Sequence, residues 1–135
     1  MKSLIKSKER VDNLGEVFTP EFIIEKMLNN IPSNYWKLNK SFLEPTCGTG
    51  NFLVEILKKK VFHGNSIIES LRSLYGIDIM EDNVIESRKR LFTTACSLGL
   101  KRVNWESAVT IIKFNIICCD ISNVEFDDIW IEKNK

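Results

Sequence analysis

The chain has 135 residues, a formal net charge of +1, 44% hydrophobic residues and 27% charged residues. This composition is typical of one soluble globular domain and excludes a collagen-like or a largely disordered protein. Apolar runs stay well short of the roughly 20 residues that cross a bilayer, and the amino terminus lacks the apolar stretch of a signal peptide. We therefore expect a cytoplasmic protein without membrane contact.

The first 14 residues form a basic segment, which we expect to be frayed and separate from a subdomain over residues 15–135. The first predicted helix begins within that subdomain. Thr19 supplies a capping hydroxyl, Pro20 suits the first helical position, and the helix should end near Asn30. The residues predicted for its buried face are Phe22, Ile23, Met27 and Leu28.

A strand, a glycine turn and a helix follow. Residues 41–44 predict a short strand, and the glycines of P-T-C-G-T-G-N-F free the backbone before a helix over about 51–60. The lysines at 58–60 are expected at a solvated helix end. A helix over about 66–73 then leads to a second apolar strand, L-Y-G-I-D-I, over residues 74–79.

The last third of the chain repeats the alternation. A long helix begins at Glu81 or Asp82 and is closed by Gly99. The final predicted strand is I-K-F-N-I-I-C-C, residues 112–119, which ends at Asp120 and is followed by irregular structure. Three strands separated by helices predict the α/β doubly wound class, with a parallel sheet and right-handed crossovers.

The four cysteines and the single histidine do not form a metal-binding pattern. The chain has no C-x-x-C pair, and His63 has no cysteine near it in sequence, so we expect no zinc or other metal site. Cys118 and Cys119 lie in an apolar run, where thiols behave as small hydrophobic groups. We expect both to be reduced core cysteines.

Three ligand-competent groups fall at the carboxyl ends of the three predicted strands: Glu44 through Gly50, Asp78 and Asp120. In a doubly wound sheet, ligands bind at this edge. The glycine turn lets the backbone approach a ligand, Asp78 can accept both hydroxyls of a ribose, and Asp120 can accept an exocyclic amino group. The sequence therefore predicts a site for an adenosine-containing ligand.

The glycine turn does not favour a dinucleotide or a nucleotide phosphate. Leu53 stands where the dinucleotide fingerprint has its third glycine. Asn51 and Phe52 stand where a P-loop has a lysine and a serine or threonine.

The stretch L-E-P-T-C-G-T-G-N-F-L, residues 43–53, resembles the cofactor motif of adenine-specific DNA methyltransferases. G-E-V-F-T-P-E-F-I-I-E-K-M looks like the segment those enzymes place upstream, Y-G-I-D-I-M-E-D-N like their ribose-binding strand end, and I-I-C-C-D-I like their adenine-binding turn. The four motifs keep the family's order from Gly15 to Ile121, as in type I and type IIG restriction-modification systems. The resemblance implies a Rossmann-like methyltransferase fold with S-adenosylmethionine as cofactor.

The resemblance also implies how the motifs surround that cofactor. The upstream segment would line its methionine end, and the glycine turn would hold its amino-acid part through Glu44 and the backbone. Asp78 would take the ribose hydroxyls and Asp120 the adenine amino group, with the following isoleucines beside the adenine. The implied cofactor-binding residues are Phe18, Thr19, Pro20, Glu44, Pro45, Thr46, Cys47, Gly48, Gly50, Asp78, Ile79, Asp120 and Ile121.

The chain departs from the family's pattern at two places. Met80 stands where many relatives have an acid, so we expect Glu81 or Asp82 to cap the following helix. The family's catalytic tetrapeptide, Asn or Asp followed by two prolines and an aromatic residue, should follow the adenine-binding turn, but no proline follows Pro45. Because that motif accepts the amine hydrogens and stacks on the extruded base, we expect no catalytic residue here and no methyl transfer by this chain alone.

The main prediction is the cofactor-binding portion of a DNA adenine-N6 methyltransferase, which would meet DNA through missing or separate domains. A second polypeptide could carry the catalytic motif. Two alternatives stay open: a methyltransferase for RNA, protein or a small molecule, and a non-catalytic cofactor-binding partner subunit. The upstream F-T-P segment favours DNA.

Overall fold

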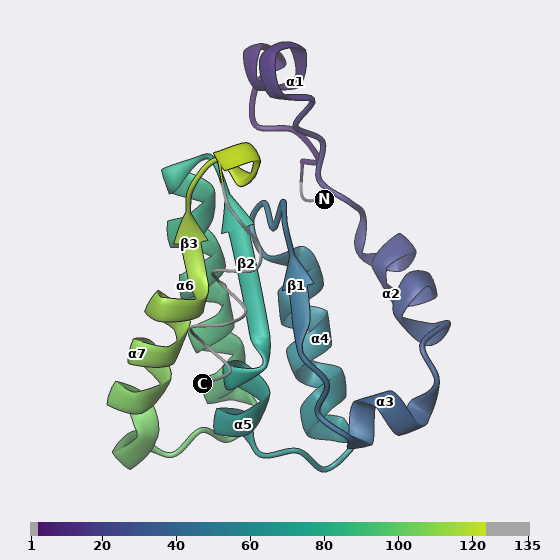
Figure 1. Ribbon diagram of the computed structural model, residues 1–135, viewed down its shortest axis with the longest axis vertical. Coiled ribbons are helices and arrows are strands. Elements are labelled where there is room, and N and C mark those ends of the chain that lie inside the picture. The colour runs from purple at the N-terminus through teal and green to yellow at the C-terminus, as the bar shows by residue number, and fades with distance from the viewer. Residues whose placement is uncertain (1–2, 124–135) are drawn as a thin grey trace.

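The computed structural model describes residues 3–123 and contains a three-stranded parallel sheet with helices packed around it (Figure 1). The strands are β1 (Phe42–Glu44), β2 (Leu74–Asp78) and β3 (Ile116–Cys118), in the order β1-β2-β3. In the register of the sheet, Leu43 pairs with Tyr75 and Ile77 pairs with Ile117. The predicted α/β class with a parallel sheet is therefore confirmed.

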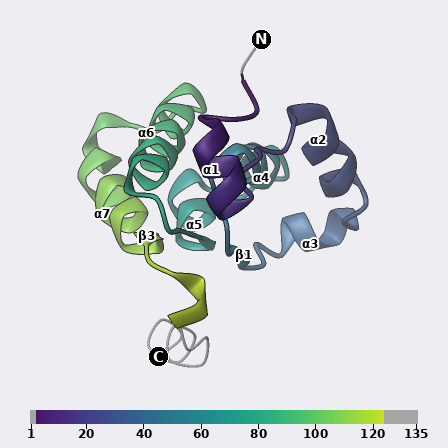
Figure 2. The ribbon, with the colours of Figure 1, turned by 90° about the horizontal axis from the view of Figure 1, so that it is seen from above.

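The helices lie mainly behind and beside the sheet. In Figure 1, α4 and α6 lie behind the strands; α2 packs on α4, and α7 packs on α5 and α6. Figure 2 views the molecule from above, with α1 beyond the carboxyl ends of the strands. Within residues 3–123, no helix is long and apolar enough to cross a bilayer. The α-helices are α1 (Lys8–Leu14), α2 (Glu21–Asn29), α3 (Ser33–Lys37), α4 (Asn51–Phe62), α5 (Ile67–Arg72), α6 (Glu81–Ser97) and α7 (Trp105–Asn115).

The hydrophobic core lies between the sheet and the helices behind it. Leu53 and Leu57 of α4 are fully buried, as are Leu74 of β2 and Leu91 of α6. Leu53 and Leu57 lie one helical turn apart, so they define the face of α4 that packs against the core. The core therefore holds the carboxyl ends of β1 and β2 in a fixed relation to the starts of α4 and α6.

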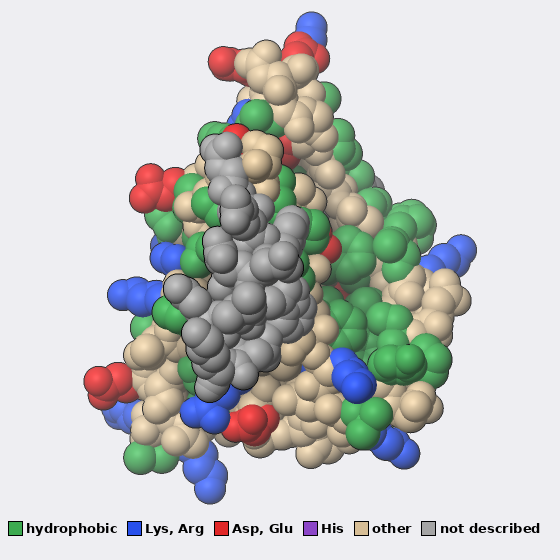
Figure 3. Space-filling view, in the orientation of Figure 1, with side chains coloured by type: hydrophobic (Ala, Val, Ile, Leu, Met, Phe, Trp, Pro, Cys, Tyr) green, Lys and Arg blue, Asp and Glu red, His purple; other side chains and the backbone are tan. Residues whose placement is uncertain are grey.

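The predicted buried face of α2 is wrong in part. Ile24 and Leu28 are buried, whereas Phe22 is 63% exposed and Met27 is 52% exposed. Residues four apart lie on one side of a helix, and in α2 the Ile24–Leu28 side is the buried one. Figure 3 shows hydrophobic side chains gathered on the surface over α2 and α3. The large exposed hydrophobic residues of this region are Phe22, Met27, Tyr35 and Leu38.

The predicted strand over 112–119 is also wrong in part, because α7 continues to Asn115 and β3 contains only Ile116–Cys118. In α7 the buried residues, Ala108, Ile112 and Asn115, recur at helical spacing. Cys118, predicted to be a core cysteine, is exposed. The strand nevertheless ends directly before Cys119 and Asp120, so the predicted position of the acid is unchanged.

Lys60 departs from its prediction as a solvated residue, since its side chain is fully buried at the end of α4. Its Nζ donates to Asn39 Oδ1 at 2.8 Å and to the Lys40 carbonyl, and it lies 5.0 Å from the centre of the Phe42 ring. Burial without a carboxylate partner lowers the pKa of Lys60 to about 8. This ammonium joins α4 to the loop before β1, at the end of the sheet opposite the carboxyl ends.

Candidate functional site

A pocket of about 340 Å³ opens at the carboxyl ends of the strands. The glycine turn, the end of β2 and the turn after β3 all contribute to it, as the sequence predicted for its three ligand groups. Eight residues of the predicted site line this pocket: Phe18, Pro45, Thr46, Gly48, Asp78, Ile79, Asp120 and Ile121.

The glycine turn reaches the pocket because its backbone adopts conformations that side chains disfavour. Gly48 has φ +53° and Gly50 has φ +89°, both in the left-handed region. A Cβ on Gly48 would lie 3.0 Å from Cδ1 of Phe18, so only a glycine lets the turn approach that ring so closely. The turn is tied to the sheet by the Cys47 N–H, which donates to the Ile77 carbonyl at 2.8 Å.

Asp78 is 9% exposed and its carboxylate is held by three donors. Oδ2 accepts from the Gly48 N–H at 2.9 Å, whereas Oδ1 accepts from the Met80 N–H at 2.8 Å and from Asn83 Nδ2 at 3.2 Å. The carboxylate therefore links the glycine turn to the start of α6. A carboxylate has about four acceptor positions, so about one position on Oδ2 is left for a ligand.

Asp120 lies at the other side of the pocket, on the turn after β3. Its Oδ1 accepts from the Ser122 hydroxyl at 2.7 Å and from the Ser122 N–H at 3.0 Å, and these two bonds lower the pKa of Asp120. Asp120 therefore orders the turn after β3 through Oδ1, and this does not conflict with its predicted ligand role. The structure shows the turn, while the ligand role stays a prediction.

The remaining predicted residues do not line the pocket: Thr19, Pro20, Glu44, Cys47 and Gly50. The N-cap of α2 is Pro20, one residue after the predicted cap Thr19, and no side chain caps this helix. Glu44 accepts from Thr46 N–H and Oγ1, and burial raises its pKa. Cys47 lies beneath the turn, where burial raises the pKa of its thiol to about 12. The Cys47 side chain is therefore a neutral thiol that packs beneath the turn and does not act as a thiolate.

The end of α1 and the residues just after it form a wall of the pocket, which sequence reasoning missed: Leu14 precedes the predicted subdomain, and Gly15, Glu16 and Val17 are its first residues. α1 is capped by Ser7, whose hydroxyl accepts from the Arg10 N–H at 3.1 Å, and it ends at Gly15 with φ +64°. Serine before the helix and glycine after it were the available signal. The additional pocket-lining residues are Leu14, Gly15, Glu16, Val17 and Cys119.

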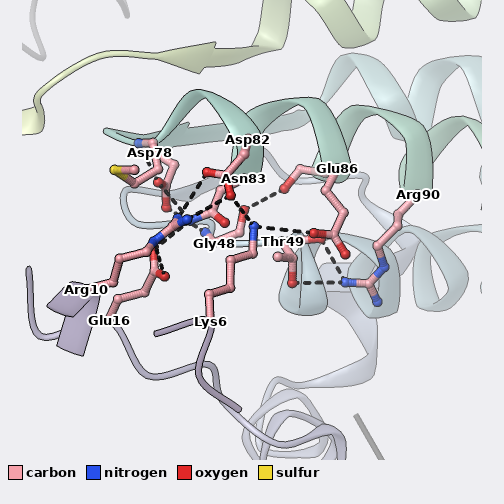
Figure 4. Close-up of polar contacts among 12 residues, drawn as sticks. Lys6, Arg10, Glu16, Gly48, Thr49, Asp78, Asp82, Asn83, Glu86 and Arg90 are labelled. Atoms are coloured by element: carbon pink, nitrogen blue, oxygen red, sulfur yellow. Dashed lines mark hydrogen bonds and ion pairs between the residues drawn. The ribbon is translucent and has the colours of Figure 1, made fainter. Parts of the chain in front are cut away.

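Ion pairs fasten α1 and the residues before it to the start of α6, so the predicted fraying is wrong for residues 3–14 (Figure 4). Arg10 Nη1 lies 2.7 Å from Asp82 Oδ2, and Lys6 Nζ lies 2.7 Å from the same oxygen. Arg10 Nε also lies 2.8 Å from Glu16 Oε1. Arg10 and Lys6 together keep the pKa of Asp82 well below its usual range.

The start of α6 differs from the prediction that Glu81 or Asp82 caps it. Met80 occupies the N-cap position, and Asp82 pairs with Arg10 and Lys6 instead. The Met80 N–H is satisfied by Asp78, so the strand-end acid stabilises this helix start. Farther along α6, Arg90 donates to the Thr49 carbonyl at 2.7 Å and braces the glycine turn (Figure 4).

The family described as N-6 DNA Methylase matches residues 4–91, about two thirds of the chain. Type II methyltransferase M.VspI of Vibrio sp. (strain 343) is 35% identical over 77 residues, which are 57% of this chain and 16% of that relative. The matched region thus spans about a sixth of the relative's length. No solved structure matches the chain significantly.

Proposed function

Since this chain belongs to the N-6 DNA methylase family, we propose that its pocket binds S-adenosylmethionine as the cofactor-binding portion of a DNA adenine-N6 methyltransferase. The observation that carries this proposal is the convergence of the glycine turn, Asp78 and Asp120 on one pocket. Its volume of about 340 Å³ lies at the lower end of the range of about 300 to 1000 Å³ for small-molecule sites.

The proposed roles follow from the groups that each wall offers. Phe18 and the Gly48 turn, which lie in close contact in the pocket wall, bind the methionine part, as the family resemblance implies. Asp78 accepts one ribose hydroxyl through the acceptor position left on Oδ2. Asp120, with a pKa below its ordinary value, is an ionised acceptor for the adenine amino group.

The residues present fit this ligand in their chemistry. A ribose and an exocyclic amine donate hydrogen bonds, and the two acids supply acceptors at the ends of β2 and β3. Ile79 and Ile121 add apolar surface for an adenine ring. When bound, S-adenosylmethionine supplies an electrophilic methyl group, and the residues described here bind and orient the molecule that carries it.

Methyl transfer itself is proposed to require residues outside this sequence. No proline follows Pro45, so the 135 residues lack the tetrapeptide that accepts the amine hydrogens and stacks on the extruded adenine. We propose that this motif and the DNA-binding surface lie in further protein, in the same or a second polypeptide, of a restriction-modification system. The 135-residue polypeptide alone is then expected to transfer no labelled methyl group to adenine-containing DNA.

Isothermal titration with S-adenosylhomocysteine tests the cofactor assignment directly. We expect saturable binding by the 135-residue polypeptide. D120N should weaken it about fivefold to tenfold, because a charge-assisted hydrogen bond becomes a neutral one. D12N, at an exposed position of α1, is the matched control and should bind like the wild type. Absence of heat at millimolar ligand in a sample with a folded circular dichroism spectrum would contradict the assignment.

A further inference from the structure

Asn83 is a fully buried amide in the first turn of α6, between the pocket wall and the end of β2 (Figure 4). Its Nδ2 donates to Glu16 Oε2 at 2.7 Å and to Asp78 Oδ1 at 3.2 Å. Both neighbours are carboxylates, which only accept when ionised, so the NH2 group must face them. One side chain thus connects the segment after α1 with the acid at the end of β2.

We propose that Asn83 is a positioning residue for the cofactor, an inference that rests on the proposed function. The amide holds Asp78 in the orientation that presents Oδ2 to the pocket, and it holds Glu16 where the pocket wall needs it. Asp78 also accepts from the Gly48 and Met80 N–H groups. Among residues 3–123, Asn83 is the only side chain with a hydrogen bond to this carboxylate, and no backbone donor reaches both acids.

The choice of an amide is informative because it does not maximise stability. Asn83 Oδ1 is buried without a hydrogen-bond partner among the described residues. Leaving such an acceptor unsatisfied lowers the stability of the folded protein. An apolar residue would avoid that cost, but it would leave two carboxylates facing each other without a shared donor. The two hydrogen bonds that Nδ2 donates therefore account for an asparagine at position 83 better than packing does.

The charges around Asn83 come from three elements. Glu16 on the pocket wall and Asp78 on β2 face it directly, and Arg10 of α1 balances Glu16. Asp82 beside it in sequence is paired with Arg10 and Lys6, and Glu86 lies 3.6 Å from Lys6. Burial, with a smaller contribution from the Asp78 charge, raises the pKa of the Cys47 thiol, which is therefore neutral and adds no charge here. A carboxylate at position 83 would thus lie against the carboxylates of Glu16 and Asp78, and the guanidinium of Arg10 would be the cation that balances all three.

The first test is N83D, which keeps the shape and replaces the donor by an acceptor. Near pH 8 we expect S-adenosylhomocysteine to bind at least about tenfold more weakly than to the wild type. As the pH falls toward about 5.5, the introduced carboxyl takes up a proton, becomes a donor and narrows the difference. N115D is the control, since Asn115 is another buried amide, bonded to the carbonyls of Leu71 and Arg72. Its affinity relative to the wild type should not change with pH.

A double-mutant cycle keeps the proposal testable if N83D does not fold. E16A should weaken binding about threefold to fivefold in the wild-type background and should have no further effect in N83A, because both changes break the same link. Additive effects of E16A and N83A, or an N83D affinity equal to that of the wild type, would overturn the role of Asn83 while leaving the cofactor site intact. Failure of the folded wild type to bind would refute the proposed function, and the role of Asn83 with it.

Discussion

Replacing Lys60 by methionine should change how the stability of the protein depends on pH. The ammonium of Lys60 is fully buried with two neutral oxygen acceptors, from Asn39 and Lys40, and its pKa falls from 10.5 to about 8. Between these two values the unfolded chain binds more protons than the folded chain, so the free energy of unfolding rises with pH. Below about pH 8 both states are protonated, and the folded protein bears the full cost of burying the charge.

The size of this effect follows from the same two values. At about 1.4 kcal/mol for each pH unit, the fall in the pKa of Lys60 from 10.5 to about 8 corresponds to about 3 kcal/mol. From near pH 7 to near pH 10, the wild type should gain about 2 to 3 kcal/mol relative to K60M, because Lys60 becomes neutral in the folded protein while it stays largely protonated in the unfolded chain.

Urea unfolding of both proteins at several pH values measures this difference directly. K58M is the matched control, since Lys58 is on the same helix but exposed, and its difference from the wild type should stay constant. A stability difference between K60M and the wild type that does not change over this pH range would refute the reasoning. It would mean that the buried ammonium keeps an ordinary pKa.

Two other perturbations test the glycine turn and the α1 wall. G50A should lower the free energy of unfolding by about 2 kcal/mol or more in urea, because φ is +89° and the new Cβ would lie 3.2 Å from the Ser87 Cα. G64A has a similar φ of +98° with open space around it, so it should cost less; equal losses would show that the contact is unimportant. R10Q should remove the ion pairs with Asp82 and make α1 more sensitive to trypsin, and high salt should do the same to the wild type. Unchanged cleavage in both cases would contradict the fastening role of Arg10.

The predicted positions of the strand ends were largely correct, because they depend on local signals. Apolar runs that stop at a glycine turn or an acid placed the end of β1 before the Gly48 turn and the end of β2 at Asp78. Parallel pairing then brings those ends to one edge regardless of the details of the helices. The convergence of the turn and the two acids on a pocket could therefore be anticipated, although what the pocket binds is still a proposal.

The errors occurred where short segments or faces depend on contacts that are distant in sequence. α1 is only Lys8–Leu14, too short to be stable alone, and it is held by Asp82 more than 70 residues away. Apolar residues lie on more than one side of α2, so the sequence does not decide which side is buried. The packing of α2 on α4 buries Ile24 and leaves Phe22 exposed. The residues before β3 suit a strand as well as a helix by their sequence, and the packing of α7 on α5 and α6 selects the helix.

The sequence by itself determined the fold class and the edge of the sheet where the glycine turn, Asp78 and Asp120 meet, because alternation and turn chemistry are local properties of the chain. Only the tertiary structure decided that Lys60 is buried, that the segment after α1 closes the pocket, and that Asn83 joins Glu16 to Asp78. The physical reason is that burial and hydrogen bonding of a polar side chain are set by groups brought close in space. Its neighbours in sequence carry little information about them.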